Sequence, residues 1–215
     1  MIISTGRRYI FVHAPKTGGT ALTLALEARA MKDDLLISDT PKAVRRRGRL
    51  KGLTPRGRLW KHSTLADIDG VVPLADLDGL RVFTLIRNPW DRLVSHYHWL
   101  RAQGFDHPQV TLAKTLPFPA FVAAPAVMAA FRASPARHYL TDAAGRERCD
   151  LFLRLEHLDQ DLPRLESLLD LRLAPLPVAN RSDRAADYRT YYDDATAALV
   201  GDICAEDIAR FGYRF

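Results

Sequence analysis

The fold of this 215-residue chain is decided by the stretch Tyr9-Ile10-Phe11-Val12-His13-Ala14-Pro15-Lys16-Thr17-Gly18-Gly19-Thr20. Its four apolar residues from Tyr9 to Val12 predict a short strand that is buried on both faces. A turn-rich loop follows, and apolar residues then dominate from Ala21 to Ala28, as in a helix. This order of strand, glycine loop and helix is typical of a parallel sheet that binds ligands at the carboxyl ends of its strands.

The glycine loop has the composition of an anion-binding site. Gly18 and Gly19 allow the backbone to approach a ligand closely, and the start of the following helix favours negative charge. Lys16 adds a positive charge and Thr20 a hydroxyl. The loop of ATP-binding kinases places its lysine after the glycines, whereas Lys16 precedes them. A simple tight turn is the alternative, and the strand-glycine-helix context favours anion binding over it.

A second group of polar residues lies where a strand expected over Arg81–Arg87 meets a helix expected to begin at Pro89. Arg87 leaves the sheet at its carboxyl edge, while Arg92 and Ser95 lie one and two turns into the helix. All three side chains could therefore converge on a second anionic group. Two alternatives stay open: Arg92 pairs with a neighbouring acid or solvent, and Ser95 is an ordinary helix-surface residue.

The rest of the chain repeats the strand-to-helix order. A third strand is expected over Leu151–Leu155, a helix over Asp161–Leu169 and a largely helical tail over Tyr188–Phe211. Residues 111–144 are interrupted by prolines and predict short helical pieces that form an insertion or lid. The whole chain is expected to form one α/β domain, with a mainly parallel central sheet flanked by helices.

The positive charge of the chain is concentrated in one segment. The chain has 31 Lys and Arg residues against 25 Asp and Glu residues, a net charge of +6. Nine cations lie at positions 41–61 without an acid among them: Lys42, Arg45, Arg46, Arg47, Arg49, Lys51, Arg56, Arg58 and Lys61. Removing these nine from the total leaves the other residues at −3. Because glycines and prolines interrupt this segment, it is expected to be an exposed loop without a regular helix, and it suits an anionic partner.

Composition excludes several classes of protein. Two cysteines cannot form a disulfide framework or a four-cysteine zinc site. The least polar run, Ala120–Phe131, is too short to cross a bilayer and contains Pro125. The residues after Met1 lack the apolar core of a signal peptide. We therefore expect a cytoplasmic protein without a transmembrane segment, and the oligomeric state stays open.

The two polar groups together resemble those of the sulfotransferases that use 3′-phosphoadenosine 5′-phosphosulfate (PAPS), in particular the carbohydrate-type branch. The stretch Phe11–Thr20 is similar to the family's 5′-phosphosulfate loop. Arg87–Ser95, with the spacing Arg-x-Pro-x-x-Arg-x-x-Ser, is similar to its 3′-phosphate site. The resemblance extends to Lys61-His62-Ser63 and to the tail from Asn180 to Phe215, and it implies a three-layer, P-loop-like fold.

The resemblance also implies a role for each matching residue. Lys16 would contact the oxygen that bridges sulfate and 5′-phosphate. The 5′-phosphate would be bound by Thr17, Gly18, Gly19 and Thr20, and the 3′-phosphate by Arg87 and Ser95. Further nucleotide contacts are expected from Arg92, Arg181 and Ser182. The product would be adenosine 3′,5′-bisphosphate (PAP), and no metal is expected.

An acceptor hydroxyl needs a base, and His62 is the first choice because the related enzymes are similar in placing a His or Glu in this region. An unperturbed imidazole has a pKa near 6.5, which suits proton abstraction around neutrality. The alternative is a structural or substrate-contacting histidine. His13, His96 and His98 are expected to have structural positions.

The sequence therefore predicts a sulfotransferase that transfers the sulfuryl group of PAPS to an acceptor hydroxyl, with a carbohydrate as the expected acceptor. One alternative is a P-loop-like nucleotide kinase or other phosphotransferase, which would need the Gly-Lys-Ser/Thr order and a magnesium ligand. A second is a non-enzymatic polyanion-binding protein that uses the segment 42–61. No specific nucleic-acid partner is expected.

Overall fold

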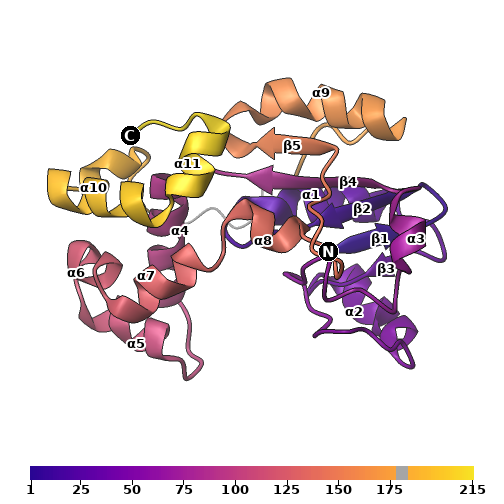
Figure 1. Cartoon of the computed structure of the whole chain (residues 1–215), viewed down its shortest axis with the longest axis horizontal. Helices are drawn as coiled ribbons and strands as arrows, with labels where there is room; N and C mark the ends of the chain where they lie inside the picture. The colour runs from indigo at the N-terminus through magenta and orange to yellow at the C-terminus, as the bar shows by residue number, and fades with distance from the viewer. Residues whose placement is uncertain (178–183) are drawn as a thin grey trace. The chain divides into compact units, whose positions relative to one another are not determined.

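The structure is a computed structural model that describes residues 1–177 and 184–215 (Figure 1). Packing of the Cα atoms divides it into two compact units. The first comprises Met1–Ile86 and Ala136–Asn180, and the second comprises Arg87–Pro135 and Arg181–Phe215. Each unit has its own buried apolar residues. That the two fold together as one domain stays a prediction.

A five-stranded sheet forms the centre of the first unit, in the order β3-β1-β2-β4-β5. The strands are β1 (Ile2–Ser4), β2 (Tyr9–Val12), β3 (Leu35–Leu36), β4 (Arg81–Ile86) and β5 (Leu151–Arg154). β2, β4 and β5 pair in parallel, while β1 is antiparallel to both β2 and β3. Four of the five strands thus run in one direction, which confirms the predicted mainly parallel sheet.

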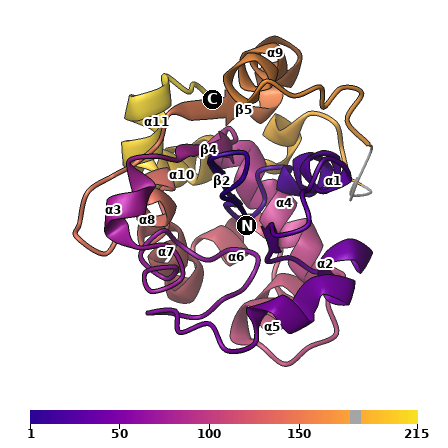
Figure 2. The ribbon, with the colours of Figure 1, turned by 90° about the vertical axis from the view of Figure 1, so that its right-hand side faces the viewer.

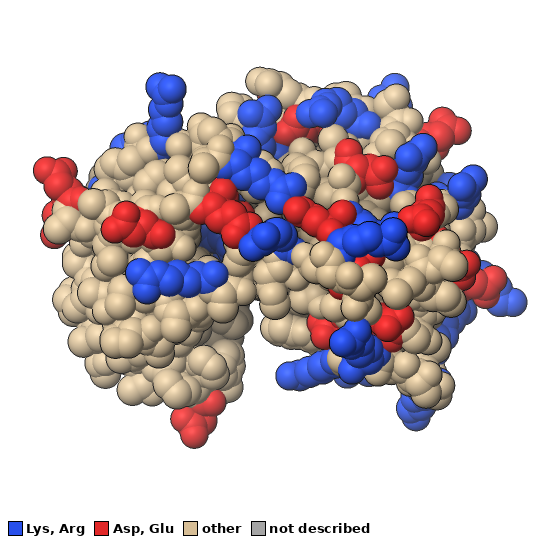
Figure 3. Space-filling model, in the orientation of Figure 1, with Lys and Arg blue, Asp and Glu red and all other residues tan. Residues whose placement is uncertain are grey.

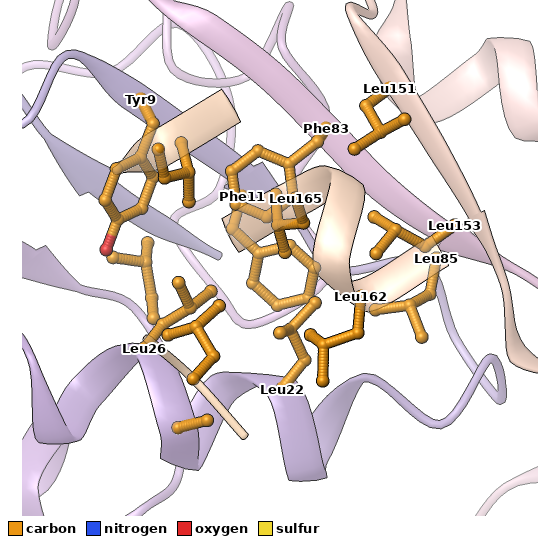
Figure 4. Packing of buried hydrophobic residues seen from close by; sticks show 14 of the residues in the cluster. Tyr9, Phe11, Leu22, Leu26, Phe83, Leu85, Leu151, Leu153, Leu162 and Leu165 are labelled. Atoms are coloured by element: carbon orange, nitrogen blue, oxygen red, sulfur yellow. The ribbon is translucent and has the colours of Figure 1, made fainter. Parts of the chain in front are cut away.

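Helices α1 (Gly19–Ala28) and α9 (Leu158–Leu169) cover one face of this sheet. In Figure 4, Leu22 and Leu165 lie against Phe11 and Phe83 in one buried cluster. The opposite face presents Ile10, packed with residues of the loop before β4 and of α3 (Leu74–Leu77) and α8 (Ala136–Leu140). Figure 2 shows the strands between these two layers. The three-layer α/β architecture is as predicted, and β2 is buried on both faces because successive side chains enter different layers.

The basic segment contains more regular structure than expected. It forms helix α2 (Pro41–Arg46), followed by a 3₁₀ turn, η1 (Arg47–Leu50). The expectation of a segment without a regular helix was wrong, because local capping outweighs the later glycines. The Thr40 hydroxyl accepts a hydrogen bond from the backbone N–H of Ala43 at 3.2 Å, and Pro41 occupies the first turn.

The second unit is helical. Its elements are α4 (Pro89–Arg101), α5 (Pro108–Thr115), α6 (Phe118–Val122), α7 (Pro125–Arg132), η3 (Tyr188–Tyr191), α10 (Asp194–Ile203) and α11 (Ala205–Phe211). α5, α6 and α7 each carry a proline in the first two positions, so the prolines that interrupt residues 111–144 start helices there. The prediction of helical pieces is confirmed, and their role as a lid stays a prediction. In the part of the chain that the structure describes, no helix is long and apolar enough to span a bilayer.

Two glycines make the tight connection from β2 to α1 possible. Gly18 has a φ of 81°, in the left-handed region, and a Cβ there would lie 2.6 Å from Cδ1 of Leu155. Gly19 begins α1, and a Cβ there would lie 2.3 Å from Cδ2 of His13. The His13 ring is buried and stacked on Phe11, so it has little room to withdraw. A side chain is therefore disfavoured at Gly18 by its left-handed backbone and at Gly19 by the close approach of the His13 ring.

We expect Gly19→Ala to lower the free energy of unfolding by about 1–3 kcal/mol, the usual range for overpacking a well-packed site. Urea denaturation measures this change. Gly48→Ala is the matched control, because no atom lies within 4 Å of a Cβ at that position. Equal midpoints for the two variants would contradict the predicted clash with His13.

Candidate functional site

The loop after β2 has the backbone shape of an anion-binding nest. Lys16 has a φ of 64° and Gly18 a φ of 81°, with Thr17 between them at negative φ. Such an alternation turns successive N–H groups toward one side, and holding a lysine in the left-handed region costs about 1–2 kcal/mol. The Thr17 hydroxyl is buried and donates to the Ala14 carbonyl at 2.9 Å, which braces the turn. Thr17 can thus offer a ligand its backbone N–H but not the hydroxyl proton.

Helix α1 adds its dipole to this loop. Its N-cap is Gly18, and no side chain caps the first turn. Gly18 is exposed, and Lys16 and Thr20 are partly exposed. The first N–H groups of α1 therefore belong to an accessible turn that has a lysine and two hydroxyl residues beside it. The five predicted loop residues, 16 to 20, lie on this one turn, which can hold a phosphate- or sulfate-like anion.

The structure brings His62 to the same strand end. Its Nδ1–H donates to the carbonyl of His13 at 2.7 Å, and the two rings meet edge to face with centroids 4.8 Å apart. A carbonyl oxygen can only accept, so Nδ1 carries the proton and Nε2 of the neutral ring carries the lone pair. His62, which sequence alone could not place, thus has a fixed tautomer next to the residue from which the anion loop begins.

The expectation that His62 has an ordinary pKa was wrong. Burial lowers the pKa of His62 to about 4. The charges of Lys61 and of the Met1 amino group act in the same direction, while the hydrogen bond to the His13 carbonyl acts against it. His62 is therefore neutral at pH 7 and stays so down to mildly acidic pH. Burial also holds the pKa of His13 well below its usual range, in keeping with the structural position expected for it.

Lys61, next to His62 in the sequence, is part of an ion pair. Its Nζ lies 2.9 Å from Oδ2 of Asp39. Both side chains are at least one-third exposed, so the pair contributes little to stability. The ion pair instead holds the Lys61 ammonium near His62, and that positive charge helps to lower the pKa of the imidazole.

In the second unit, the carboxylate of Asp91 joins two arginines. Arg87 donates from Nε to Oδ2 of Asp91 at 2.8 Å, and its Nη2 lies 2.7 Å from the same oxygen. Nη2 of Arg184 lies 2.7 Å from Oδ1. The exposed fractions of the three side chains are 10% for Arg87, 17% for Asp91 and 13% for Arg184. The group thus carries one excess positive charge in a largely dehydrated setting, where guanidinium positions are well defined.

Sequence reasoning considered Asp91 only as a partner of Arg92, and it missed the pairing of Asp91 with Arg87 and the contribution of Arg184. The signal for Asp91 was its i, i+4 spacing from Arg87 across the start of α4. For Arg184 there was only its place in the polar loop that begins at Asn180. Arg181 and Ser182, the predicted contacts in that loop, lie outside the described residues.

Arg92 and Ser95 are buried on α4, so the surface position considered for Ser95 is excluded. Nη1 of Arg92 donates to the Ser134 carbonyl at 3.4 Å, and its guanidinium lies 5.5 Å from the centre of the Phe131 ring. These contacts direct Arg92 toward the end of α7. The roles of Arg92 and Ser95 in nucleotide binding stay predictions, as does joint binding of one ligand by the loop and the Arg87 group.

The three tyrosines of the tail, Tyr188, Tyr191 and Tyr192, are partly buried against the apolar residues of the second unit, whereas Phe215 is 43% exposed. The Tyr192 hydroxyl donates to the Trp90 carbonyl at 2.8 Å, and Tyr188 accepts from the Asn88 amide at 3.2 Å. The Phe215 ring lies 5.3 Å from that of Tyr192. His96 pairs with the Gln109 amide oxygen at 3.0 Å, which confirms its structural position.

The basic segment divides into paired and unpaired cations. Lys42 donates to the Glu27 carbonyl, Arg46 to Met31 at 2.7 Å and Arg56 to Ala143 at 3.2 Å. Among the described residues of this segment, four other exposed cations have no ion pair with an acid: Arg45, Arg49, Lys51 and Arg58. Arg47 lies close enough to Asp39 to help lower the pKa of that carboxyl. Figure 3 shows Asp and Glu side chains interspersed with Lys and Arg on the face of the first unit that it presents.

We expect Asp91→Asn to lower the free energy of unfolding by about 2–3 kcal/mol. This loss lies just below the roughly 3–5 kcal/mol expected when a fully buried pair is broken, because the three groups keep some exposure. Urea denaturation in dilute buffer measures the loss, and 50 mM sulfate should restore more stability to the variant than to the wild type. The matched control is Asp187→Asn in the same unit, since Asp187 pairs with Arg189 on the surface and should contribute less than about 1 kcal/mol. A loss no larger than that of the control would contradict the bridging role.

Comparison with known proteins shows a structural likeness but no likeness in sequence to a known family. No protein-family model matches the sequence, and no curated protein matches it either. Among solved structures, the chain is similar to mouse sulfotransferase SULT7A1 complexed with PAP, with a TM-score of 0.46 and 13% sequence identity. The match covers 94% of this chain and 84% of the mouse chain.

Proposed function

We propose that the protein is a sulfotransferase that transfers the sulfuryl group of PAPS to an acceptor hydroxyl, with a carbohydrate as the acceptor class. The observation that carries the proposal is the pairing of an anion-binding turn at residues 16–20 with a neutral, tautomer-fixed His62 at the end of β2. The sequence pattern of the two phosphate motifs supports the same assignment. The expected cytoplasmic location is part of this proposal.

In this proposal the turn binds the 5′-phosphosulfate of PAPS. Backbone N–H groups of residues 17–20 contact the phosphate oxygens, and the Thr20 hydroxyl adds a donor. The Lys16 ammonium lies on the oxygen that bridges phosphorus and sulfur. Negative charge develops on that oxygen as the S–O bond breaks, so a preplaced cation stabilises the transition state more than the ground state.

His62 is the proposed general base. As the acceptor oxygen forms its bond to sulfur, the hydroxyl proton moves to Nε2 of His62. The electron pair of the broken S–O bond stays on the 5′-phosphate oxygen, which completes PAP. The His13 carbonyl accepts from Nδ1–H throughout, so it orients the ring and stabilises the imidazolium that forms.

The arginines of the second unit are the proposed 3′-phosphate contacts. Arg87 and Ser95 match the sequence motif, and Arg184 joins them because Asp91 holds its guanidinium against the same carboxylate as that of Arg87. Arg92, Arg181 and Ser182 are secondary contacts in the same proposal. A 3′-phosphate adds two negative charges that ATP lacks on its ribose, so these arginines favour PAPS over ATP. No metal has a role in this scheme.

The kinase alternative is disfavoured by the order of residues in the loop, in which Lys16 precedes both glycines. The polyanion-binding alternative rests on the exposed cations of the basic segment, among them Arg45, Arg47, Arg49 and Lys51. It leaves the turn at 16–20 and the neutral His62 without a role. The affinity for PAP relative to that for ATP therefore distinguishes the sulfotransferase from the two alternatives.

We expect the purified protein to bind PAP at least tenfold more tightly than ATP in isothermal titration calorimetry, without added metal. Lys16→Ala and Arg87→Ala should each weaken PAP binding by about 1.5–3 kcal/mol, the usual value of a hydrogen bond to a charged group. Equal affinity for PAP and ATP would overturn the proposal.

Arg45→Ala and Lys51→Ala are the matched controls for charge, because each removes one cation from the exposed basic segment. Their PAP affinity should stay within twofold of the wild type in the same titration. A loss as large as that of Lys16→Ala would instead favour a general polyanion-binding surface.

We expect His62→Ala to lower transfer from labelled PAPS, assayed over a panel of glycans, by about a hundredfold or more while PAP still binds. A base must be neutral to act, so wild-type turnover is lost only as the pH falls through the lowered pKa, near 4. Turnover that halves near pH 6.5 would contradict the buried base, and unchanged turnover in His62→Ala would remove it from the mechanism.

A further inference from the structure

Trp60 is an exposed indole in direct contact with the proposed base. Its exposed fraction is 42%, and its ring meets that of His62 at 90° with centroids 5.0 Å apart. Single exposed apolar residues are common on protein surfaces and need no explanation. Among the exposed large apolar residues that the structure describes, however, Trp60 is the one that touches a residue of the candidate site.

A cation accompanies this indole. The Arg58 guanidinium lies over the ring, 5.5 Å from its centre, and Arg58 is exposed with no acidic partner in the described parts of the chain. An exposed cation–π contact is worth only about 0.5–1 kcal/mol, so Arg58 can turn to an anion at small cost. The pair thus offers an apolar ring surface and a positive charge side by side.

The buried Ser63 hydroxyl holds the turn that carries Arg58 and Trp60. The backbone N–H of Trp60 donates to the Ser63 hydroxyl oxygen at 2.9 Å, and that hydroxyl lies 2.8 Å from the Arg58 carbonyl, to which it can donate. Ser63 is fully buried. The backbone of residues 58–63 is therefore anchored, and the indole is presented beside His62 without loop ordering on binding.

We propose that Trp60 and Arg58 form the acceptor subsite, and that its ligand is a pyranose ring bearing a carboxylate or sulfate. The inference rests on the proposed function and narrows its acceptor class. The apolar C–H face of a pyranose packs on indole, as other flat apolar groups do. A carboxylate or sulfate on the ring would pair with Arg58.

The charge around the subsite favours an anionic sugar over a neutral one. Residues 41–61 contain no acid, and Arg45, Arg47, Arg49 and Lys51 extend the positive charge along the same segment. Two acids lie nearby: Asp39 pairs with Lys61, and Asp67, beside Gly57, accepts a hydrogen bond from the Thr64 backbone N–H at 2.7 Å. A neutral sugar would use the indole but leave these cations without a role.

The test is a calorimetric titration of PAP-saturated protein with two probes of equal length, hyaluronan hexasaccharide, which is anionic, and chitohexaose, which is neutral. We expect the wild type to bind the anionic probe at least fivefold more tightly. Trp60→Ala should weaken binding of the anionic probe at least tenfold, whereas Trp60→Phe, which keeps an aromatic ring, should stay within threefold. Arg58→Gln should abolish the preference between the probes.

Phe105→Ala is the matched control, because Phe105 is an exposed aromatic residue of the second unit. It should bind both probes as the wild type does. Titration of PAP into Trp60→Ala reports folding of the nucleotide site, and its affinity should stay within twofold.

Wild-type binding of neither probe, or identical titrations for Trp60→Ala and the wild type, would overturn the subsite. In either case intact PAP binding would leave the proposed function standing. Loss of PAP binding in the wild type would overturn the proposed function itself, and titration of both probes into the PAP-free protein would then decide the sugar site separately.

Discussion

The parallel pairing of β2 with β4 is the constraint on which the candidate site in the first unit depends. Tyr9 lies opposite Arg81 and Val12 opposite Thr84, and the Thr84 hydroxyl donates to the Val12 carbonyl at 2.7 Å. This register fixes where the carboxyl end of β2 lies relative to β4. The chain leaves the sheet at His13, whose ring then sets the position of α1 through its contact at Gly19. The anion-binding turn is the short path that remains between these two fixed points.

Much of the fold could be predicted from local sequence. β2 was predicted with its observed bounds, and β4, β5 and α9 were predicted within a few residues, because apolar runs with turn residues after them are clear signals. β1 and β3 were missed, since three and two residues are too few to show a period. α2 was missed because a good N-cap outweighed the later glycines.

The candidate site could be predicted only in part, for a physical reason. The turn at residues 16–20 is formed by neighbouring residues, so its lysine and glycines are recognisable in the sequence. The tautomer of His62 depends on a carbonyl 49 residues away, and the pairing of Arg184 depends on Asp91, far earlier in the chain. Long-range partners of this kind leave no local pattern. The lowered pKa of His62 likewise arises from burial, which the residue types around it do not reveal.

The hydrogen bond that fixes the His62 tautomer comes from a main-chain carbonyl, and this has a consequence for how residue 13 can vary. Any amino acid at position 13 supplies the same oxygen, so the tautomer of the base is independent of the His13 side chain. That side chain is limited instead by shape, because it must fill the space between Phe11 and the first residue of α1. A different flat ring at position 13 would therefore keep the hydrogen bond that orients the base, because that bond comes from the backbone.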